Sequence, residues 1–334
     1  MTVTHCEPFP SISCRGESLR IRRGLTLMEL VVVLAILAAL ATAATVATER
    51  VLMQRRFEIT QHSLGSFRRA VLGQYGTPES TAQQAAAMEG FVADLGRLPV
   101  AAGNDPEFQL AELWARADVV APYGMKTSAS DPEVSLPCGW RGPYLELPVG
   151  ASGLLDGWGR RYEVIALDVS LAQVPAADGD TIFGLRSLGS DGVSGFTADS
   201  PPLGEDLTVL LLDASDAKWS AQLNISVHER DEFGELIAPQ GNGDLIVRVY
   251  GAGPTGQVAH VESSMLTGPF TTPPEITFEE IPIGPKVLRA YWQYPDTSGR
   301  NSVPMSVKVT QSGVSQFQLI LPAGATIPAE EEEP

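Results

Sequence analysis

Cysteine and histidine are scarce in this chain of 334 residues. Its cysteines are Cys6, Cys14 and Cys138, and no Cys or His pair has the spacing of a zinc site. The histidines are His5, His62, His228 and His260, and they complete no Ser/His/Asp or Cys/His set. His228 and Glu229 with His260 could hold a metal, but two histidines on separate strands are usually structural. We therefore expect a protein that is not an enzyme.

Positive charge is also in short supply. Lys and Arg total 23 against 40 Asp and Glu, which gives a formal net charge of −17. Proteins that bind nucleic acids or anionic lipids need surfaces rich in Lys and Arg. The charge balance argues against both roles, and we expect no nucleic-acid partner.

Charge is missing altogether from Leu30 to Thr48, a run of 19 residues (48 − 30 + 1). At about 1.5 Å rise per residue, a helix of this length spans most of a ~30 Å hydrocarbon core. Four arginines precede the run, at positions 15, 20, 22 and 23. They should keep the N-terminal side in the cytoplasm, so the sequence predicts a single-pass membrane protein.

Helix-breaking residues are absent over a longer range, because no Gly or Pro occurs between Leu25 and Leu64. Apolar residues continue at helical spacing beyond Thr48, at Met53, Phe57, Leu64, Phe67 and Val71. We predict one helix from about Leu25 to about Tyr75, roughly 75 Å long. Its first half is apolar on all sides and its second half is amphipathic.

A cleavable secretory signal peptide is the alternative interpretation of this segment. Ala39-Leu40-Ala41 offers a cleavage site of the small-x-small type. Two observations count against it. The apolar core of a signal peptide does not usually contain a carboxylate, and here Glu29 stands near its start. The helical pattern also continues well past the apolar run.

The stretch RRG-LTLMELVVVLAILAAL resembles the processing site of type IV pilins and of the pseudopilins of type II secretion systems. Gly24 matches the residue before the cut and Leu25 the new N-terminus, where the family more often has Phe. Thr26, Leu27 and Glu29 also match. The resemblance implies cleavage by prepilin peptidase, N-methylation of Leu25 and assembly into a helical filament. Val46 departs from the family, since many pilins have a proline in this region.

Glu29 has a physical role in this interpretation. After cleavage, Leu25 carries an α-ammonium group at the edge of the hydrocarbon, where an unpaired charge is costly. Glu29 lies four residues on, one helical turn away. In a filament it could pair with the Leu25 amine of a neighbouring subunit, which would drive assembly and fix the register. The alternative is a carboxylate that simply lies at the membrane interface.

The region after the helix adds to the resemblance. Gly-Pro-Tyr-Leu, Asp-x-Trp-Gly-x-x-Tyr and Ser-Leu-Gly-x-Asp-Gly follow in this order, as in the major pseudopilin of type II secretion, and the similarity covers roughly Leu25 to Leu207. From the residues we predict a short helix within Met88–Pro99 that ends at Pro99. We also predict a turn at Asp156–Gly159 and a strand at Tyr162–Leu167. The resemblance implies an α+β head.

The loop SLGSDG…GED is the predicted metal site. Ca²⁺ takes six to eight oxygen ligands, and in the family this loop binds calcium. The resemblance implies carboxylate ligands at Asp191, Glu205 and Asp206, with carbonyl ligands at Leu188 and Val193. The loop is longer than that of the family and Asp199 could contribute instead. A solvated acidic loop is the alternative.

Beyond Leu207 the sequence alternates between apolar and polar residues in six segments: 223–229, 244–251, 275–284, 285–294, 302–311 and 315–322. Gly, Pro, Asn and Asp separate them, which predicts a small antiparallel β-sandwich. ITFEEIPIGPKVLRAYW is weakly similar to the prealbumin-like, carboxypeptidase-regulatory domains, which are usually non-catalytic. Tyr291, Trp292 and Tyr294 suggest a sugar or protein contact, or more simply a half-buried aromatic strand.

The predicted order of domains is a leader (1–24), a membrane and stalk helix (25–75), a pseudopilin-like head (76–215), a β-sandwich (216–325) and an acidic tail (326–334). We expect a structural subunit of a type II secretion pseudopilus or a related type IV filament. Its partners would be other pilin or pseudopilin subunits, prepilin peptidase and an inner-membrane assembly platform. Its C-terminal domains would lie in the periplasm or on an extracellular filament. The alternative is a membrane-anchored or secreted β-sandwich that binds a carbohydrate or protein without entering a filament.

Overall fold

A computed structural model describes residues 27–73, 90–105, 108–194, 206–213, 216–217, 219–293, 299–310 and 314–322. Several predicted features lie outside these residues: the leader, Gly24, Leu25, Asp199, Glu205, Tyr294 and the acidic tail. The chain divides into two compact units, residues 1–52 and residues 53–334. The predicted boundaries within the second unit stay predictions.

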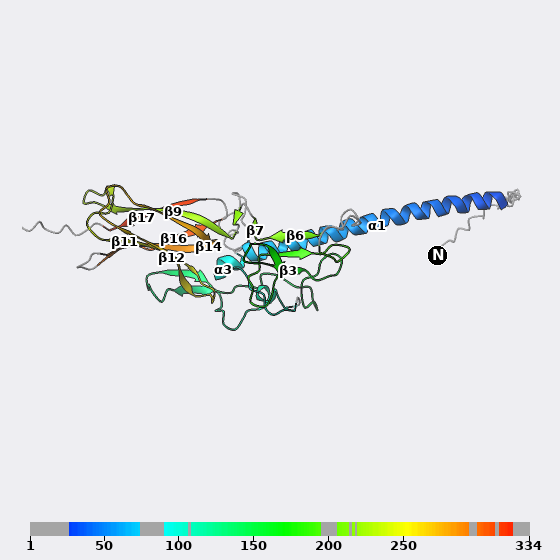
Figure 1. Ribbon diagram of the computed structural model, residues 1–334, viewed down its shortest axis with the longest axis horizontal. Coiled ribbons are helices and arrows are strands. Elements are labelled where there is room, and N and C mark those ends of the chain that lie inside the picture. Colours follow the sequence, from blue (N-terminus) through cyan, green and yellow to red (C-terminus); the bar gives the residue numbers. More distant parts are fainter. Residues whose placement is uncertain are drawn as a thin grey trace, which may run out of the picture. The chain divides into compact units, whose positions relative to one another are not determined.

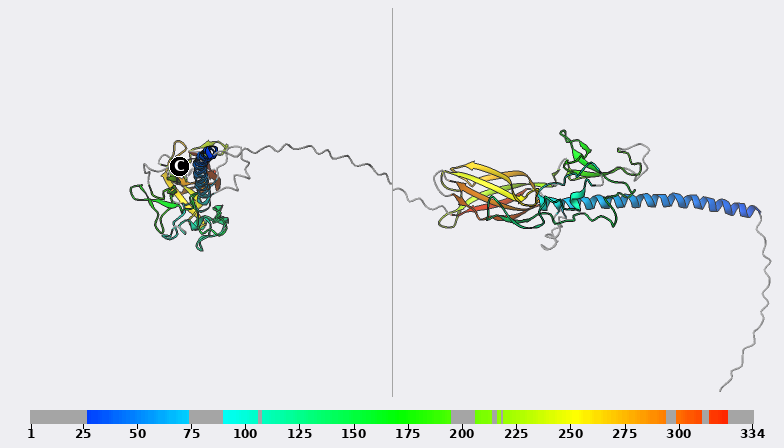
Figure 2. Two further views of the ribbon diagram at one scale, coloured as in Figure 1. Left: turned by 90° about the vertical axis from the view of Figure 1, so that its right-hand side faces the viewer. Right: turned by 90° about the horizontal axis from the view of Figure 1, so that it is seen from below.

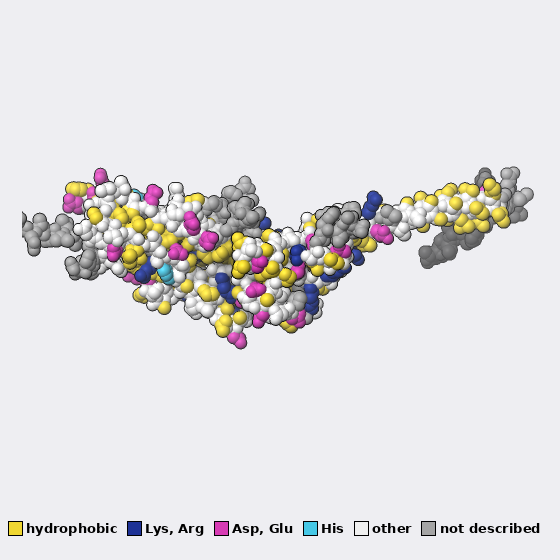
Figure 3. All heavy atoms as spheres, in the orientation of Figure 1, with side chains coloured by type: hydrophobic (Ala, Val, Ile, Leu, Met, Phe, Trp, Pro, Cys, Tyr) yellow, Lys and Arg dark blue, Asp and Glu magenta, His cyan; other side chains and the backbone are white. Residues whose placement is uncertain are grey.

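Helix α1 spans Leu27–Leu72, close to the predicted range of 25–75, and it continues through Gly65 (Figure 1). Its 46 residues correspond to a length of about 69 Å. From Leu27 to Leu52 nearly every side chain is exposed, including large apolar ones such as Leu34 and Leu40, and Figure 3 shows this stretch covered in hydrophobic side chains. By length and composition this segment can cross a membrane.

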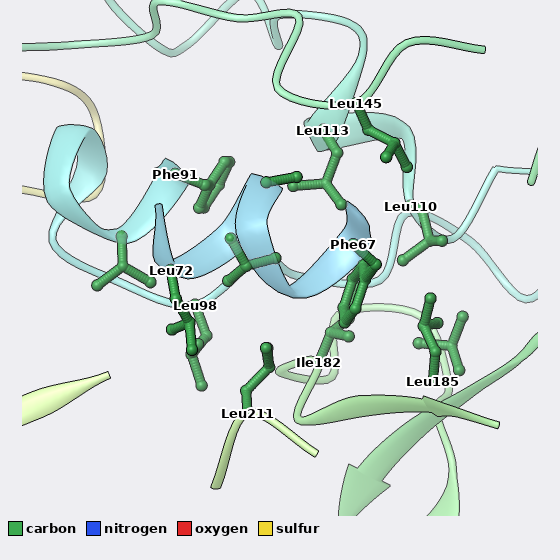
Figure 4. Close-up of a cluster of buried hydrophobic side chains, with 14 of the residues drawn as sticks. Phe67, Leu72, Phe91, Leu98, Leu110, Leu113, Leu145, Ile182, Leu185 and Leu211 are labelled. Carbon is green, nitrogen blue, oxygen red and sulfur yellow. The ribbon is translucent and has the colours of Figure 1, made fainter. Parts of the chain in front are cut away.

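The last turns of α1 are the centre of the head's core. Leu64, Phe67, Val71 and Leu72 are buried there. They pack with residues from the rest of the head, among them Phe91, Leu95, Leu98, Leu113, Ile182, Leu185 and Leu211 (Figure 4). One helix therefore changes from fully exposed apolar residues to a one-sided apolar face, which is the predicted change from membrane helix to stalk.

A glycine turn fixes the head to the stalk helix. The backbone N–H of Gly157 donates a hydrogen bond of 2.9 Å to the hydroxyl of Thr60, whose own hydroxyl donates to the carbonyl of Arg56. A Cβ at Gly157 would lie 1.9 Å from that carbonyl oxygen. Only glycine permits this approach, so the Asp-Gly-Trp-Gly turn is part of the docking surface for α1.

In the described part of the head, two short helices accompany a small sheet. Helix α3 spans Phe91–Leu95, and the 3-10 helix η1 spans Ala111–Leu113. The sheet has the order β4-β3-β5-β6 and is antiparallel. Its strands are β3 (Glu163–Leu167), β4 (Gln173–Pro175), β5 (Gly184–Ser187) and β6 (Leu207–Leu210).

The prediction that Pro99 ends the short helix was wrong. Gly96 ends α3 in the left-handed conformation, with φ +64°. A Cβ there would also lie 1.9 Å from the carbonyl oxygen of Ala252. The position therefore requires glycine both for its backbone angle and for the contact with the C-terminal region.

The C-terminal region contains two sheets (Figures 1 and 2). One has the order β10-β9-β13, with β17 also paired to β9; the other has the order β12-β11-β14-β15, with β16 also paired to β14. The strands are β9 (Ser220–Arg230), β10 (Leu236–Ile237), β11 (Asp244–Ala252), β12 (Val258–Thr267), β13 (Glu275–Pro282), β14 (Gly284–Gln293), β15 (Arg300–Asn301), β16 (Met305–Val309) and β17 (Ser315–Leu321).

Two smaller strand pairs lie outside these sheets. They are β1 (Gly124–Thr127) with β2 (Ser135–Cys138) and β7 (Leu212–Asp213) with β8 (Asp216–Ala217).

The α+β class and the sandwich agree with the prediction, with two differences. Strand β17 runs parallel to β9, whereas the other described pairs are antiparallel. Strand β12 was not predicted. It lies at one end of its sheet, and its exposed and half-exposed residues include His260, Glu262 and Ser263. Such a strand lacks the strong alternation by which the other strands were found.

The sandwich shares a core with the head. The β1–β2 hairpin contributes Val134, which directly precedes β2, and Leu136 and Cys138 of β2. These side chains pack with Tyr250, Ala252, Val258 and Val287 of the sandwich. The thiol of Cys138 is buried here, and burial raises its pKa to about 11. The hairpin therefore joins the two parts through apolar contacts, and the sandwich is more than a module tethered by a linker.

Candidate functional site

The first candidate site is the N-terminal turn of α1. Glu29 lies in this turn, is exposed, and is surrounded along the helix by exposed apolar residues. A carboxylate near a helix N-terminus is favoured by the helix dipole. Gly24 and Leu25 lie outside the described residues, so the predicted pairing of Glu29 with the Leu25 amine stays a prediction. What the structure shows is an exposed apolar helix that needs a bilayer or other helices around it.

The second candidate site is the loop after β5, which is tied to the 156–160 turn by one carboxylate. Asp156 is buried, and its Oδ1 accepts the backbone N–H groups of Trp158 and Arg160 at 2.9 and 2.8 Å. Its Oδ2 accepts the hydroxyl of Ser187 at 2.7 Å. The same Ser187 oxygen accepts the N–H of Gly189 at 3.3 Å. Asp156 thus holds the start of the loop against the turn.

The predicted calcium ligands are only partly described. The carbonyl of Leu188 accepts the N–H of Gly192 at 3.0 Å, and the carboxylate of Asp191 accepts the N–H of Val193 at 3.0 Å. Asp206 directly precedes β6. Glu205 lies outside the described residues, so the full set is untested. Among the residues with described positions, no three Asp, Glu, His or Cys side chains form a group that could hold a metal.

A cation that the sequence reasoning missed contacts this loop. The guanidinium of Arg160 donates to the carbonyls of Gly189 and Ser190 at 2.5 and 2.9 Å. The available signal was the position of Arg160 directly after the Trp-Gly turn, where a long cationic side chain could reach the neighbouring loop. Reasoning from carboxylates alone overlooked it.

The histidines considered for a metal belong to different sheets. His228 lies on β9, and His260 lies on β12, where its ring is 6.0 Å from that of Tyr250. The aromatic segment is not an open binding surface either. Trp292 is fully buried, and the hydroxyl of Tyr291 donates to Asp131. The interpretation as a half-buried aromatic strand therefore fits better than a sugar contact.

A groove of about 500 Å³ opens where the head meets the sandwich. Leu98, Phe183 and Trp219 are among its apolar walls. Its charged lining consists of Glu262, Glu279 and Glu280, together with Arg97, which pairs with Glu112. Glu279 and Glu280 lie at the irregularity in β13 where its pairing with β9 shifts. Exposed carboxylates above apolar walls suit a ligand with a cationic group.

Residues 19–45 match the prokaryotic N-terminal methylation motif. No curated protein and no solved structure matches the chain. The motif covers Gly24, Leu25 and Glu29 and the first part of α1. The chain thus carries the N-terminal signature of type IV pilin-like proteins, which indicates processing by prepilin peptidase, a single-pass membrane anchor and a structural role.

Proposed function

We propose that this protein is a structural subunit of a type II secretion pseudopilus or a related type IV filament. The observation that carries the proposal is the continuity of α1. The methylation motif lies at the start of a helix that is exposed through Leu52 and uncharged from Leu30 to Thr48, and whose later residues Leu64, Phe67 and Val71 belong to the head's core. A filament of packed N-terminal helices would cover the exposed part while displaying the head and sandwich outside.

The specific pseudopilus role rests on the order of head motifs. The Asp-Gly-Trp-Gly turn docks on α1 through Gly157 and Thr60, and the loop after β5 is tied to the same turn through Asp156. These motifs therefore form one connected structure at the base of the head. In this role the head would lie in the periplasm, and an inner-membrane platform would add subunits to the filament.

The groove favours a second candidate function, a membrane-anchored protein that binds a partner through the seam between the head and the sandwich. Its three glutamates would face a basic segment of that partner. This protein would remain in the membrane as separate copies. Cross-linking between the α1 helices of neighbouring copies distinguishes the two functions, since only the filament predicts ladders of cross-linked subunits.

Replacing Gly24 by Ala should stop processing. A peptidase that cuts after this residue must bring the backbone close to its catalytic groups, and a Cβ at the cut hinders that approach. We expect the full-length precursor to become the main species in membranes, as seen by immunoblot. Ser18→Ala, also in the leader, should leave cleavage unchanged. Equal cleavage of the Gly24→Ala and wild-type chains would contradict processing at this position.

A further inference from the structure

The loop from Ser187 to Ser194 closes around the side chain of Arg160. Two consecutive carbonyls, those of Gly189 and Ser190, accept hydrogen bonds from the two terminal nitrogens of its guanidinium. Gly192 approaches the same group from its own part of the loop, with φ +73°. A Cβ built at Gly192 would lie 2.8 Å from Arg160 Cζ. The backbone of three loop residues therefore lies against the guanidinium of the half-buried Arg160.

The position of Arg160 is itself fixed. Its backbone N–H donates to Asp156 Oδ1 at 2.8 Å, and its carbonyl accepts the N–H of Asp156 at 2.8 Å. Asp156 also accepts the Ser187 hydroxyl at the first residue of the loop. One buried carboxylate, that of Asp156, thus holds both the backbone of Arg160 and the start of the loop. This places the guanidinium of Arg160 within hydrogen-bonding distance of the loop.

We infer that the guanidinium of Arg160 is the resident cation of the 187–194 loop and holds it in the absence of calcium. Inward-turned carbonyls are the groups that such a loop would offer to a metal ion. Here the carbonyls of Gly189 and Ser190, which lie between the predicted carbonyl ligands Leu188 and Val193, bind a side chain that remains charged at every physiological pH. A divalent ion placed beside the guanidinium would also meet repulsion from a like charge.

This inference and the calcium expectation predict different behaviour. If calcium orders the loop, chelation should release it, because Asp191, Glu205 and Asp206 would then repel one another. If Arg160 orders the loop, chelation should have no effect and removal of the guanidinium should release it. Neither outcome depends on filament assembly, so the test is independent of the proposed function.

The experiment is hydrogen exchange by mass spectrometry on the full-length protein in detergent, in millimolar CaCl₂ and in EGTA. We expect peptides covering residues 187–194 to exchange at the same rate in both conditions in the wild type. In Arg160→Met their exchange should accelerate by about tenfold or more, since two charge-assisted hydrogen bonds are lost. Arg161→Met is the matched control at the next, exposed position and should leave the loop unchanged.

Peptides from β11 should keep their wild-type exchange in every variant, which shows that the sandwich remains folded. Faster exchange of wild-type 187–194 in EGTA would overturn the inference and support a calcium site. Equal exchange in Arg160→Met and Arg161→Met would also overturn it. The wild-type comparison needs no variant, so it decides the question even if Arg160→Met does not fold.

Discussion

Glu29→Ala should insert into the membrane and be processed, yet fail to assemble. Removing a carboxylate makes the helix more apolar, so insertion is not impaired. Assembly would instead bring the α-ammonium group of Leu25 into the packed helices without a partner. A charge at the bilayer centre costs roughly 2.5–3.5 kcal/mol on insertion scales, and we take a similar cost for an unpaired ammonium group buried among packed helices. Since about 1.4 kcal/mol corresponds to a factor of ten, incorporation into filaments should fall roughly a hundredfold.

The measurement is the amount of subunit in sheared or cross-linked filaments relative to the membrane pool. Glu49→Ala is a suitable control, because Glu49 is exposed on the same helix just beyond the uncharged run. It should assemble like the wild type. If Glu29→Ala also assembles normally, Glu29 does not pair with the Leu25 amine, and the carboxylate only marks the membrane interface.

Asp131→Ala should strongly destabilise the part of the chain that contains the β1–β2 hairpin and the sandwich. Arg289 on β14 donates from Nη1 to both carboxylate oxygens of Asp131, at 2.5 and 2.6 Å, and both residues are buried. The hydroxyl of Tyr291 also donates to Asp131. A hydrogen bond of 2.7 Å joins the hydroxyls of Tyr291 and Tyr250. Without Asp131, the buried Arg289 keeps only the exposed Glu133 as a charged partner. Breaking a buried pair typically costs about 3–5 kcal/mol. We expect a loss of this size in the free energy of unfolding in urea.

Glu133→Ala is the matched control in the same loop. Glu133 also accepts a hydrogen bond from Arg289, but its side chain is 66% exposed, so its removal should cost no more than about 1 kcal/mol. Equal losses in the two variants would show that the Asp131 pair does not stabilise the junction between the hairpin loop and the sandwich.

The Asp131–Arg289 pair should also make the free energy of unfolding depend on pH. Burial raises the pKa of Asp131, but hydrogen bonds from Tyr291 and Arg289 outweigh it and hold the pKa below its ordinary value of 3.8. A carboxylate with a lower pKa in the folded state adds stability that is complete above the unfolded pKa and is lost as the pH falls through the folded pKa. The contribution of Asp131 is therefore complete at neutral pH and is lost only below about pH 4.

Features that depend on local composition could be predicted from the sequence. The absence of Gly and Pro up to Leu64 and the apolar spacing beyond Thr48 predicted α1 within a few residues, and alternation of apolar and polar residues predicted β9, β11, β13, β14 and β17. These signals reflect burial on one face of an element, which repeats along the chain. The exposed apolar half of α1 and the motif around Gly24 could be recognised because each is contiguous in the sequence.

Features that depend on contacts between distant segments could not be predicted. Arg289 and Asp131 are 158 residues apart, and each alone resembles an ordinary surface charge. Arg160 is 29 residues from Gly189, and its neighbour Arg161 has the same chemistry but is exposed. Only the fold decides which arginine lies inside the loop. The β1–β2 hairpin was missed because its strands are short and its apolar residues pack against the sandwich.

The intact mass of the protein purified from its native membranes tests the central claim most directly. The account predicts a single mature species that has lost residues 1–24 and carries one added methyl group, placed on Leu25 by fragmentation of the N-terminal peptide. A chain that begins at Thr42 or nearby would show cleavage by signal peptidase instead. That result would remove the helix segment on which filament assembly depends and would contradict the account.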